Sequence, residues 1–339
     1  MTGKKSNIKM SVIQPYIDVN VKFPIETERV GRKWVAWGAE DDYPSYLYDL
    51  YLTVPTLKTC VDGLCDYVCG GGSDSVDNKL LRDIVFSHVL FGGVCFNVIR
   101  NGLGDVNEIK VMDIRHIRTD KYKEKIWFSP DFGRKTWGRV KTMELDNGGA
   151  VQLFTNSMYS IYPVPMWAAA AAACEMEKSI DVFHLNAINN GFQGSCLFNF
   201  NNGVPEESEQ DDITRAIEEK FTGKDNAGRI IVSFNDSKDT ATEVTPITPT
   251  DFSDRYNTMA EWARQQIFTA FRATPNLMGV PLENNGFNSQ EYDAAYKIFN
   301  KTVVEPLRRD IENEISSILG RAIVIKPFTI NNISGTENE

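Results

Sequence analysis

Apolar residues recur at intervals of three and four along much of the chain, and this spacing predicts amphipathic helices. In one stretch, Leu57, Val61 and Leu64 step along a single helical face. Pro306 lies inside the last predicted helix, where it removes a backbone hydrogen bond, so we expect a kink near 302–306. The predicted helices span 56–69, 78–91, 166–190, 208–221, 250–272 and 288–319.

An unbroken run of alanines, Ala168–Ala173, opens the helix expected over 166–190. Alanine is the strongest helix former, and an alanine face lets a neighbouring backbone approach closely. Glu175, Glu177 and Lys178 follow the run, so the segment is too polar to cross a bilayer. The residues alone leave two interpretations open. The segment is either a long core helix of an ordinary domain or one stave of a helical tube packed against copies of itself.

Short apolar segments between the helices predict strands, and turn residues indicate how some of them are joined. Asn101-Gly102 indicates one hairpin, and Asp146–Gly149 indicates a second that would join 139–145 to 150–155. The region 94–162 is therefore expected to be rich in antiparallel strands, which makes the chain α+β. Strands are expected at 94–100, 108–112, 125–129, 195–200, 229–234 and 322–330.

Composition and charge limit the possible functions. The 339 residues include 36 lysines and arginines against 46 acidic residues, which gives a formal net charge of −10. Such a chain lacks the basic footprint of a protein that wraps DNA, and suits a surface that must not stick to a polyanion. Six irregularly spaced cysteines indicate free thiols in a reducing compartment. No signal peptide or membrane-spanning segment is expected.

Motifs that carry enzyme chemistry are missing from the sequence. There is no phosphate-binding G-x-x-x-x-G-K-[ST] loop and no G-x-S-x-G nucleophile turn. His88, His116 and His184 lack the spacing of metal ligands, and the cysteines within 60–69 lack a fourth ligand for zinc. We therefore expect no catalytic residue, no cofactor and no metal. The acidic residues at 40–42 are expected to complement the positive end of a following helix rather than to bind a metal.

Five segments of the chain, taken in order, share the pattern of one family. They are Trp34–Gly38 with Tyr43-Pro44, the stretch 175–194, the helix and strand of 208–234, the stretch 267–281, and the kinked helix that follows. Together they resemble the portal proteins of tailed bacteriophages, in the long-tailed-phage portal family. The chain is short for that family, so a large crown is not expected.

The resemblance implies a phage-portal fold with a wing, a two-helix stem, an α/β clip insert and a long kinked helix. The wing would comprise an N-terminal arm, helices and a β-rich region. The implied divisions are a wing at 1–165, a first stem helix at 166–192, a clip at 193–250, a second stem helix at 251–273, a tunnel loop at 274–288, and a kinked wing or crown helix with a C-terminal strand at 289–339.

The resemblance also implies a non-enzymatic role. Family members form a ring, commonly dodecameric, at one capsid vertex, and double-stranded DNA enters and leaves through its channel. The implied partners are further copies of the chain, double-stranded DNA, the large terminase motor, the major capsid protein and head–tail adaptor proteins, with no membrane. The protein would act in the virion at the capsid portal vertex, after assembly in the host cytoplasm.

Three groups of residues become candidate sites through the resemblance. The stem-packing residues are Ala168, Ala171 and Ala172, and Ala171→Trp is expected to impair assembly more than folding. The tunnel-loop residues are Asn276, Leu277, Met278, Asn284 and Asn285, of which the asparagines can touch phosphates without strong ionic trapping. The residues that would dock the motor and the adaptor are Glu209, Asp211, Asp212 and Glu218.

Two other functions stay open. The first is another oligomeric virion component, such as a connector or scaffold protein, although two long helices that flank a strand–helix insert argue against it. The second is a metal-dependent nucleic-acid-processing enzyme, in which scattered carboxylates would assemble a two-metal site. Metal-dependent cleavage of DNA would identify that enzyme.

Overall fold

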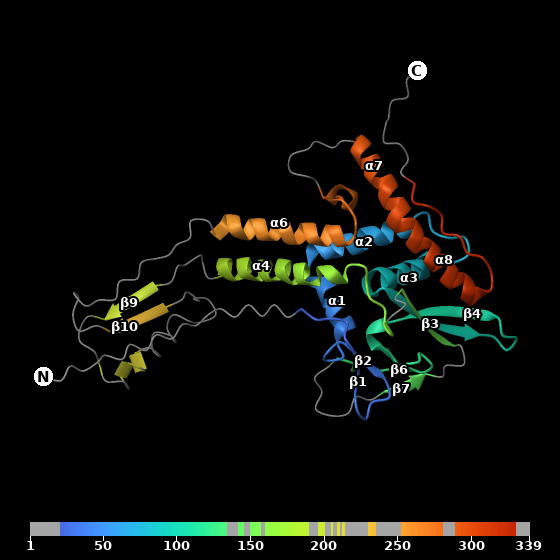
Figure 1. Ribbon diagram of the computed structural model, residues 1–339, viewed down its shortest axis with the longest axis horizontal. Coiled ribbons are helices and arrows are strands. Elements are labelled where there is room, and N and C mark those ends of the chain that lie inside the picture. Colours follow the sequence, from blue (N-terminus) through green and yellow to red (C-terminus); the bar gives the residue numbers. More distant parts are fainter. Residues whose placement is uncertain are drawn as a thin grey trace, which may run out of the picture.

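The computed structural model has a mixed body of helices and short strands, from which two long helices project side by side (Figure 1). This is the α+β architecture that the sequence predicts. The structure describes residues 21–133, 142–145, 150–156, 160–189, 196–200, 205, 209–210, 212–213, 230–234, 252–280 and 289–329.

Helix α2 (Pro55–Cys69) lies at the centre of the body, where it contacts α1, α3, α6 and α8. Its apolar face is fully buried, as the spacing of Leu57, Val61 and Leu64 predicts. Helix α3 begins and ends at the predicted residues because the Asp77 carboxylate caps its first turn and Gly92, in the left-handed conformation, ends it. The other body helices are α1 (Tyr43–Thr53), α3 (Asn78–Phe91), α7 (Ser289–Phe299) and α8 (Glu305–Leu319).

The strands of the body form small antiparallel sheets. The hairpin predicted at Asn101-Gly102 is confirmed, since it joins β3 to β4. The second predicted hairpin is wrong: β7 pairs with β6, whereas β8 pairs with β3, with Leu153 opposite Cys95. The strands are β1 (Glu26–Glu28), β2 (Val35–Trp37), β3 (Gly93–Arg100), β4 (Val106–Met112), β5 (Ile117–Thr119), β6 (Ile126–Phe128), β7 (Met143–Leu145) and β8 (Val151–Thr155).

Beyond the tips of the projecting helices lies a separate strand pair, β9 (Cys196–Phe200) and β10 (Ile230–Phe234) (Figure 1). The two strands are parallel, with Cys196 opposite Ile230. Parallel neighbours need a crossover connection, and the described residues between them, Glu209-Gln210 and Asp212-Ile213, are helical. The predicted strand–helix–strand insert therefore pairs its two strands within one chain.

The C-terminal part of the body differs from the prediction. Among the described residues 322–329 no strand forms; instead the extended chain lies across the end of α2. The Gly71 N–H donates to the Lys326 carbonyl at 3.0 Å, and the Lys326 N–H donates to the Gly72 carbonyl at 2.8 Å. A Cβ added at Gly70 would lie 2.3 Å from the Lys326 carbonyl oxygen, so only glycine permits this approach.

The long C-terminal helix is interrupted where the sequence predicts. A π-helix, Asn300–Val304, joins α7 to α8 directly before Pro306. Within it the Glu305 N–H donates to the carbonyl of Asn300, five residues back. The wider turn accommodates a proline whose ring would otherwise clash with the preceding carbonyl.

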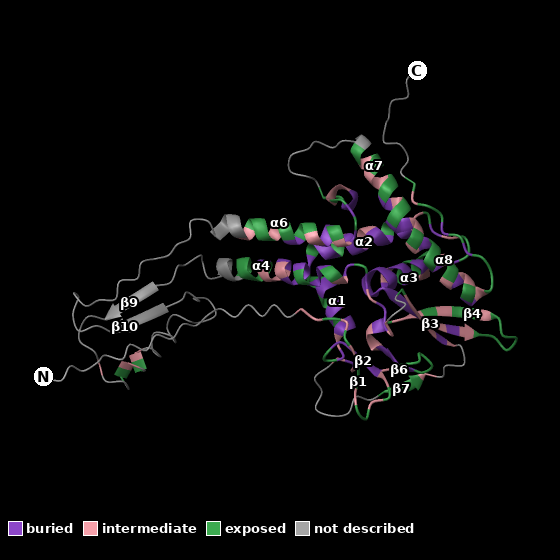
Figure 2. Cartoon of the chain, viewed as in Figure 1, coloured by how far each residue is buried: buried purple, intermediate pink, exposed green. Residues whose placement is uncertain are grey.

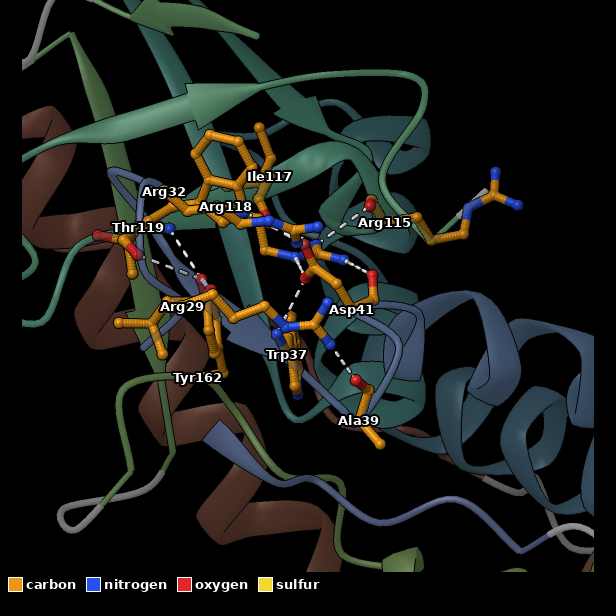
Figure 3. Close-up of polar contacts among 12 residues, drawn as sticks. Arg29, Arg32, Trp37, Ala39, Asp41, Arg115, Ile117, Arg118, Thr119 and Tyr162 are labelled. Atoms are coloured by element: carbon orange, nitrogen blue, oxygen red, sulfur yellow. Dashed lines mark hydrogen bonds and ion pairs between the residues drawn. The ribbon is translucent and has the colours of Figure 1, made fainter. Parts of the chain in front are cut away.

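A buried ion pair joins the N-terminal segment to β5 (Figure 3). The Arg118 side chain is fully buried, and its Nε donates to the Asp41 carboxylate at 2.6 Å. The same carboxylate accepts the Trp37 backbone N–H at 2.9 Å, and the Trp37 ring stacks on Tyr162 with centroids 4.5 Å apart. Asp41 has a φ of 63°, a left-handed conformation that is uncommon outside glycine.

The role predicted for the acidic residues at 40–42 is therefore wrong for Asp41. Asp41 compensates the buried guanidinium of Arg118 rather than the start of α1. Asp42 occupies the N-cap position of α1, but its side chain makes no capping hydrogen bond and instead pairs with Lys22. A buried arginine contributed from a distant strand outcompetes the weaker attraction of a helix terminus.

Replacing Asp41 with alanine should destabilise the fold strongly, because it leaves the buried Arg118 charge without its partner. We expect Asp41→Ala to lower the free energy of unfolding by about 3–5 kcal/mol. The matched control is Asp49→Ala, since Asp49 pairs with Lys178 at 2.6 Å on the surface. That change should cost about 1 kcal/mol or less. Urea unfolding of both variants measures the difference, and equal losses would contradict this role of Asp41.

Candidate functional site

The two projecting helices, α4 (Ala171–Asn189) and α6 (Phe252–Ala270), pack against each other along one seam (Figure 1). Ala263 and Ile267 of α6 are fully buried. Further from the body, Phe183 of α4 stacks on Tyr256 of α6 with ring centroids 4.5 Å apart. One small and several large apolar side chains therefore hold the pair together.

The alanine run lies at the root of this pair rather than along its length. It begins as a 3₁₀ helix, η2 (Ala168–Ala170), and continues into α4. Ala171 is buried in the core of its own chain, Ala168 is half-buried, and Ala172 is exposed. Of the three residues expected to pack between copies, Ala172 is the one left open to a neighbour. The larger predicted effect of Ala171→Trp on assembly than on folding does not fit a side chain buried within one chain.

The outer half of the pair leaves large apolar side chains in solvent (Figure 2). Trp262 of α6 is 48% exposed and Met259, one turn before it, is 45% exposed. On α4, Val182 and Leu185 are each more than half exposed. Large apolar side chains left in solvent on the same helical pair are typical of a surface that another protein covers.

Two polar contacts fasten the root of α4 to the body, and a third joins it to α6. The Thr56 hydroxyl of α2 donates to the Glu177 carboxylate at 2.7 Å, and Lys178 pairs with Asp49 of α1. Glu177 is buried, its second carboxylate oxygen has no hydrogen-bond partner, and the Arg264 guanidinium lies 3.8 Å from the first. Burial therefore raises the pKa of Glu177, and it also raises the pKa of the neighbouring Glu175.

The connection that leaves α6 is anchored to α2. Residues Pro275–Met278 form a 3₁₀ helix, η4, in which Leu277 and Met278 are buried. The Tyr67 hydroxyl donates to the Leu277 carbonyl at 2.7 Å. Met278 fits against Gly63, where a Cβ would lie 2.6 Å from the methionine sulfur. The side chains of Leu277 and Met278 thus face the body, whereas Asn276 is half-buried; Asn284 and Asn285 lie outside the described residues.

The acidic candidates belong to the insert between β9 and β10. Glu209 and Asp212 are exposed and helical. Asp211 and Glu218 lie outside the described residues. The two described carboxylates are thus accessible at the end of the molecule that lies beyond the helical pair (Figure 1).

Trp262 is the member of the exposed surface that the sequence pattern did not reveal. The apolar repeat of α6 runs through Met259, Ala263 and Ile267, and Trp262 lies beside it. Met259 belongs to this repeat and is 45% exposed, whereas Trp262 lies off it and is 48% exposed, so the repeat alone does not show which apolar residues stay in solvent.

Tryptophan substitutions at two neighbouring alanines should distinguish the alanine in the core from the alanine on the surface. Ala171→Trp inserts a large ring into the core and should lower the free energy of unfolding by about 1–3 kcal/mol or more. Ala172→Trp places the same ring on the surface, where we expect a change of about 0.5 kcal/mol or less. Thermal and urea unfolding of the two variants measure this; comparable losses would show that Ala172 also lies in the chain's own core.

Among the described residues no helix has both the length and the apolar character to span a membrane.

Comparison with known proteins places the chain in a family. None of the curated proteins matches the chain. A crystal structure of an HK97 family phage portal protein from Corynebacterium diphtheriae matches with a TM-score of 0.51 and 11% sequence identity, over 81% of this chain and 93% of that one.

Two assemblies of a gene transfer agent particle also contain similar chains. A chain of the native virion matches with a TM-score of 0.49 and 17% identity, over 83% of both chains. A chain of the native neck, computed with C12 symmetry, matches with a TM-score of 0.47 and 16% identity, over 83% of this chain and 80% of that one. The family model for phage portal proteins matches residues 77–331, well over half of the chain, and the protein therefore belongs to the phage portal protein family.

Proposed function

We propose that copies of this chain form a closed, dodecameric ring at one vertex of a phage capsid, with a central channel for double-stranded DNA. DNA is packaged and later ejected through this channel. The role is architectural rather than catalytic. The protein acts in the virion at the portal vertex, after assembly in the host cytoplasm.

Exposed apolar side chains on the projecting helices carry this proposal. Trp262 and Met259 of α6, together with Val182 and Leu185 of α4, lie on a pair of helices that the body does not cover. A head-to-tail contact repeated around a rotation axis would cover them at every subunit and close without leaving an unpaired end. The helical pairs would then stand side by side as the wall of a tube.

The parts of the chain take the following roles in this ring. Residues 1–165 are the wing, which contacts the major capsid protein. The helical pair, 166–192 and 251–273, is the stem, and 193–250 is the clip. The connection 274–288 approaches the channel, with Leu277 and Met278 anchoring it to α2 rather than touching DNA. The last part, 289–339, completes the wing or crown.

Charge favours free movement of DNA through such a channel. With a net charge of −10, the chain offers few cations to displace the counterions of DNA, so contacts release little free energy and do not trap the duplex. Polar side chains such as Asn276 can contact phosphates without a strong ionic bond.

Trp262→Ser should prevent rings from forming while the subunit stays folded. Burial of a large apolar side chain contributes about 1.5–3 kcal/mol, and the loss recurs at every interface. The matched control is Leu103→Ser, because Leu103 is 89% exposed but lies in the β3–β4 turn of the body. Negative-stain microscopy and native mass measurement should find rings for Leu103→Ser and single subunits for Trp262→Ser. Intact rings of both variants would contradict the proposed interface.

The acidic helix of the insert is proposed to dock the terminase motor and, later, the tail adaptor. Charge reversal at Asp211 and Asp212, supported by Glu209 and Glu218, should weaken motor binding about tenfold at low salt and flatten its salt dependence. Asp310→Lys, on exposed α8 of the body, is the control. Pull-down across a salt series measures binding by intact rings; unchanged binding after reversal at Asp211 and Asp212 would place the docking surface elsewhere.

A further inference from the structure

One carbonyl in the long C-terminal helix lacks its normal helical donor. In an α-helix the N–H of residue 306 would donate to the carbonyl of Thr302, four residues back. Residue 306 is a proline, which has no N–H. The N–H of Glu305, one residue before the proline, is already donated to the Asn300 carbonyl. The Thr302 carbonyl thus lacks its α-helical donor, and it can accept a hydrogen bond from another part of the molecule.

Arg272 supplies that partner from the end of the projecting pair. Its Nη2 donates to the Thr302 carbonyl at 2.7 Å. Arg272 stands two residues after α6 ends and has a φ of 53°, a conformation uncommon for a residue with a side chain. Its own N–H donates to the Thr269 carbonyl at 2.9 Å, which ties the arginine to the last turn of α6. The strained backbone thus directs the guanidinium at the carbonyl that Pro306 leaves open.

The two helices joined by this contact belong to different parts of the molecule (Figure 1). Helix α6 projects, whereas the π-helix and α8 are fixed in the body. Val303 and Val304 are buried, and the Arg308 guanidinium, itself buried, donates to the Tyr67 carbonyl at 2.8 Å. Movement of the projecting pair relative to the body would therefore stretch the contact between Arg272 and Thr302.

We propose that Arg272 is a positioning residue that fixes the projecting helical pair at one place relative to the kinked C-terminal helix. This rests on the proposed function, in which that pair walls the DNA channel. Each subunit under load from moving DNA would then keep the segment after α6 at a constant position in the channel.

Because the contact is exposed, we expect its loss to reduce DNA packaging without lowering the free energy of unfolding by much. Both Arg272 and Thr302 are exposed, so water can hydrate the carbonyl when the guanidinium is removed. Water satisfies the carbonyl but does not tie α6 to the π-helix. The subunit should therefore fold and form rings without Arg272, while the helical pair loses its fixed position.

The test uses the full chain assembled into particles with its packaging motor. We expect Arg272→Ala rings to form at the wild-type level, to melt within a few degrees of the wild type, and to package at least fivefold less DNA per particle. Arg272→Lys keeps a donor of the same charge and should retain an intermediate yield. The control is Arg309→Ala, which removes an exposed positive charge from α8, seven residues after Thr302. Its particles should package an amount of DNA within twofold of the wild type.

A second variant distinguishes positioning from mere satisfaction of the carbonyl. Pro306→Ala restores an N–H that can pair with Thr302 inside the helix. If Arg272 only caps that carbonyl, the double variant Arg272→Ala with Pro306→Ala will package as well as Pro306→Ala alone, and the proposal is overturned. If Arg272 positions α6, the double variant will melt like Pro306→Ala but package as poorly as Arg272→Ala.

Hydrogen exchange in purified rings gives a measure that does not depend on packaging. Arg272→Ala should raise the exchange of amides in 271–280 at least tenfold and leave α3, in the body, unchanged. Wild-type exchange in 271–280 would overturn the positioning role, whereas failure of the wild-type chain to form rings would overturn the proposed function instead.

Discussion

Helix α2 determines where the other long helices of the chain lie, because each of them contacts it. The Thr56 hydroxyl of α2 donates to the Glu177 carboxylate at the root of α4, and Gly63 of α2 leaves the space that Met278 fills. Near its end, Tyr67 donates a hydrogen bond to the Leu277 carbonyl and accepts one at its own carbonyl from Arg308 of α8. Burial raises the pKa of Tyr67, so the hydroxyl stays protonated and keeps its donor. One central helix therefore positions both the projecting pair and the kinked helix.

This arrangement divides the molecule into a self-sufficient body and an incomplete projection. The body pairs its buried Arg118 charge with Asp41 within the chain, and its core is continuous from α1 to α8. The projecting pair has only one buried seam, and Trp262 and Leu185 stay in solvent. In the proposed ring, a neighbouring subunit would cover these side chains and add the burial that the projecting pair lacks.

Local patterns in the sequence predicted the elements whose partners are near in the chain. The spacing of apolar residues placed α3 at its actual bounds, and Asn101-Gly102 identified the β3–β4 hairpin. The same reasoning failed where pairing is distant: β8 pairs with β3, although fifty residues separate the two strands and a turn signal directly precedes β8. The residue types of a turn indicate where the chain can reverse direction, but they do not decide which strands pair. The buried strand β3 pairs with the strand whose apolar residues match its own buried face.

The candidate sites show the same limit. Alanine spacing identified a helix suited to close contact, but which alanine meets its own core and which meets a neighbour depends on the three-dimensional root of α4: Ala171 lies inside and Ala172 outside. Leu277 and Met278, expected at the channel, are instead buried against the body, and Met278 fills the space beside Gly63. The sequence does not show which residue will pack against a glycine inside a helix.

Pro306 gave a more specific prediction than the alanine run, because proline removes one defined hydrogen-bond donor from a helix. The missing N–H at Pro306 identifies the carbonyl of Thr302 as the group that loses its α-helical donor. The structure supplies that donor from the end of α6 through Arg272. The interruption between α7 and α8 is thus the point at which the end of α6 is attached, so the same irregularity that breaks one helix links the kinked helix to the projecting pair.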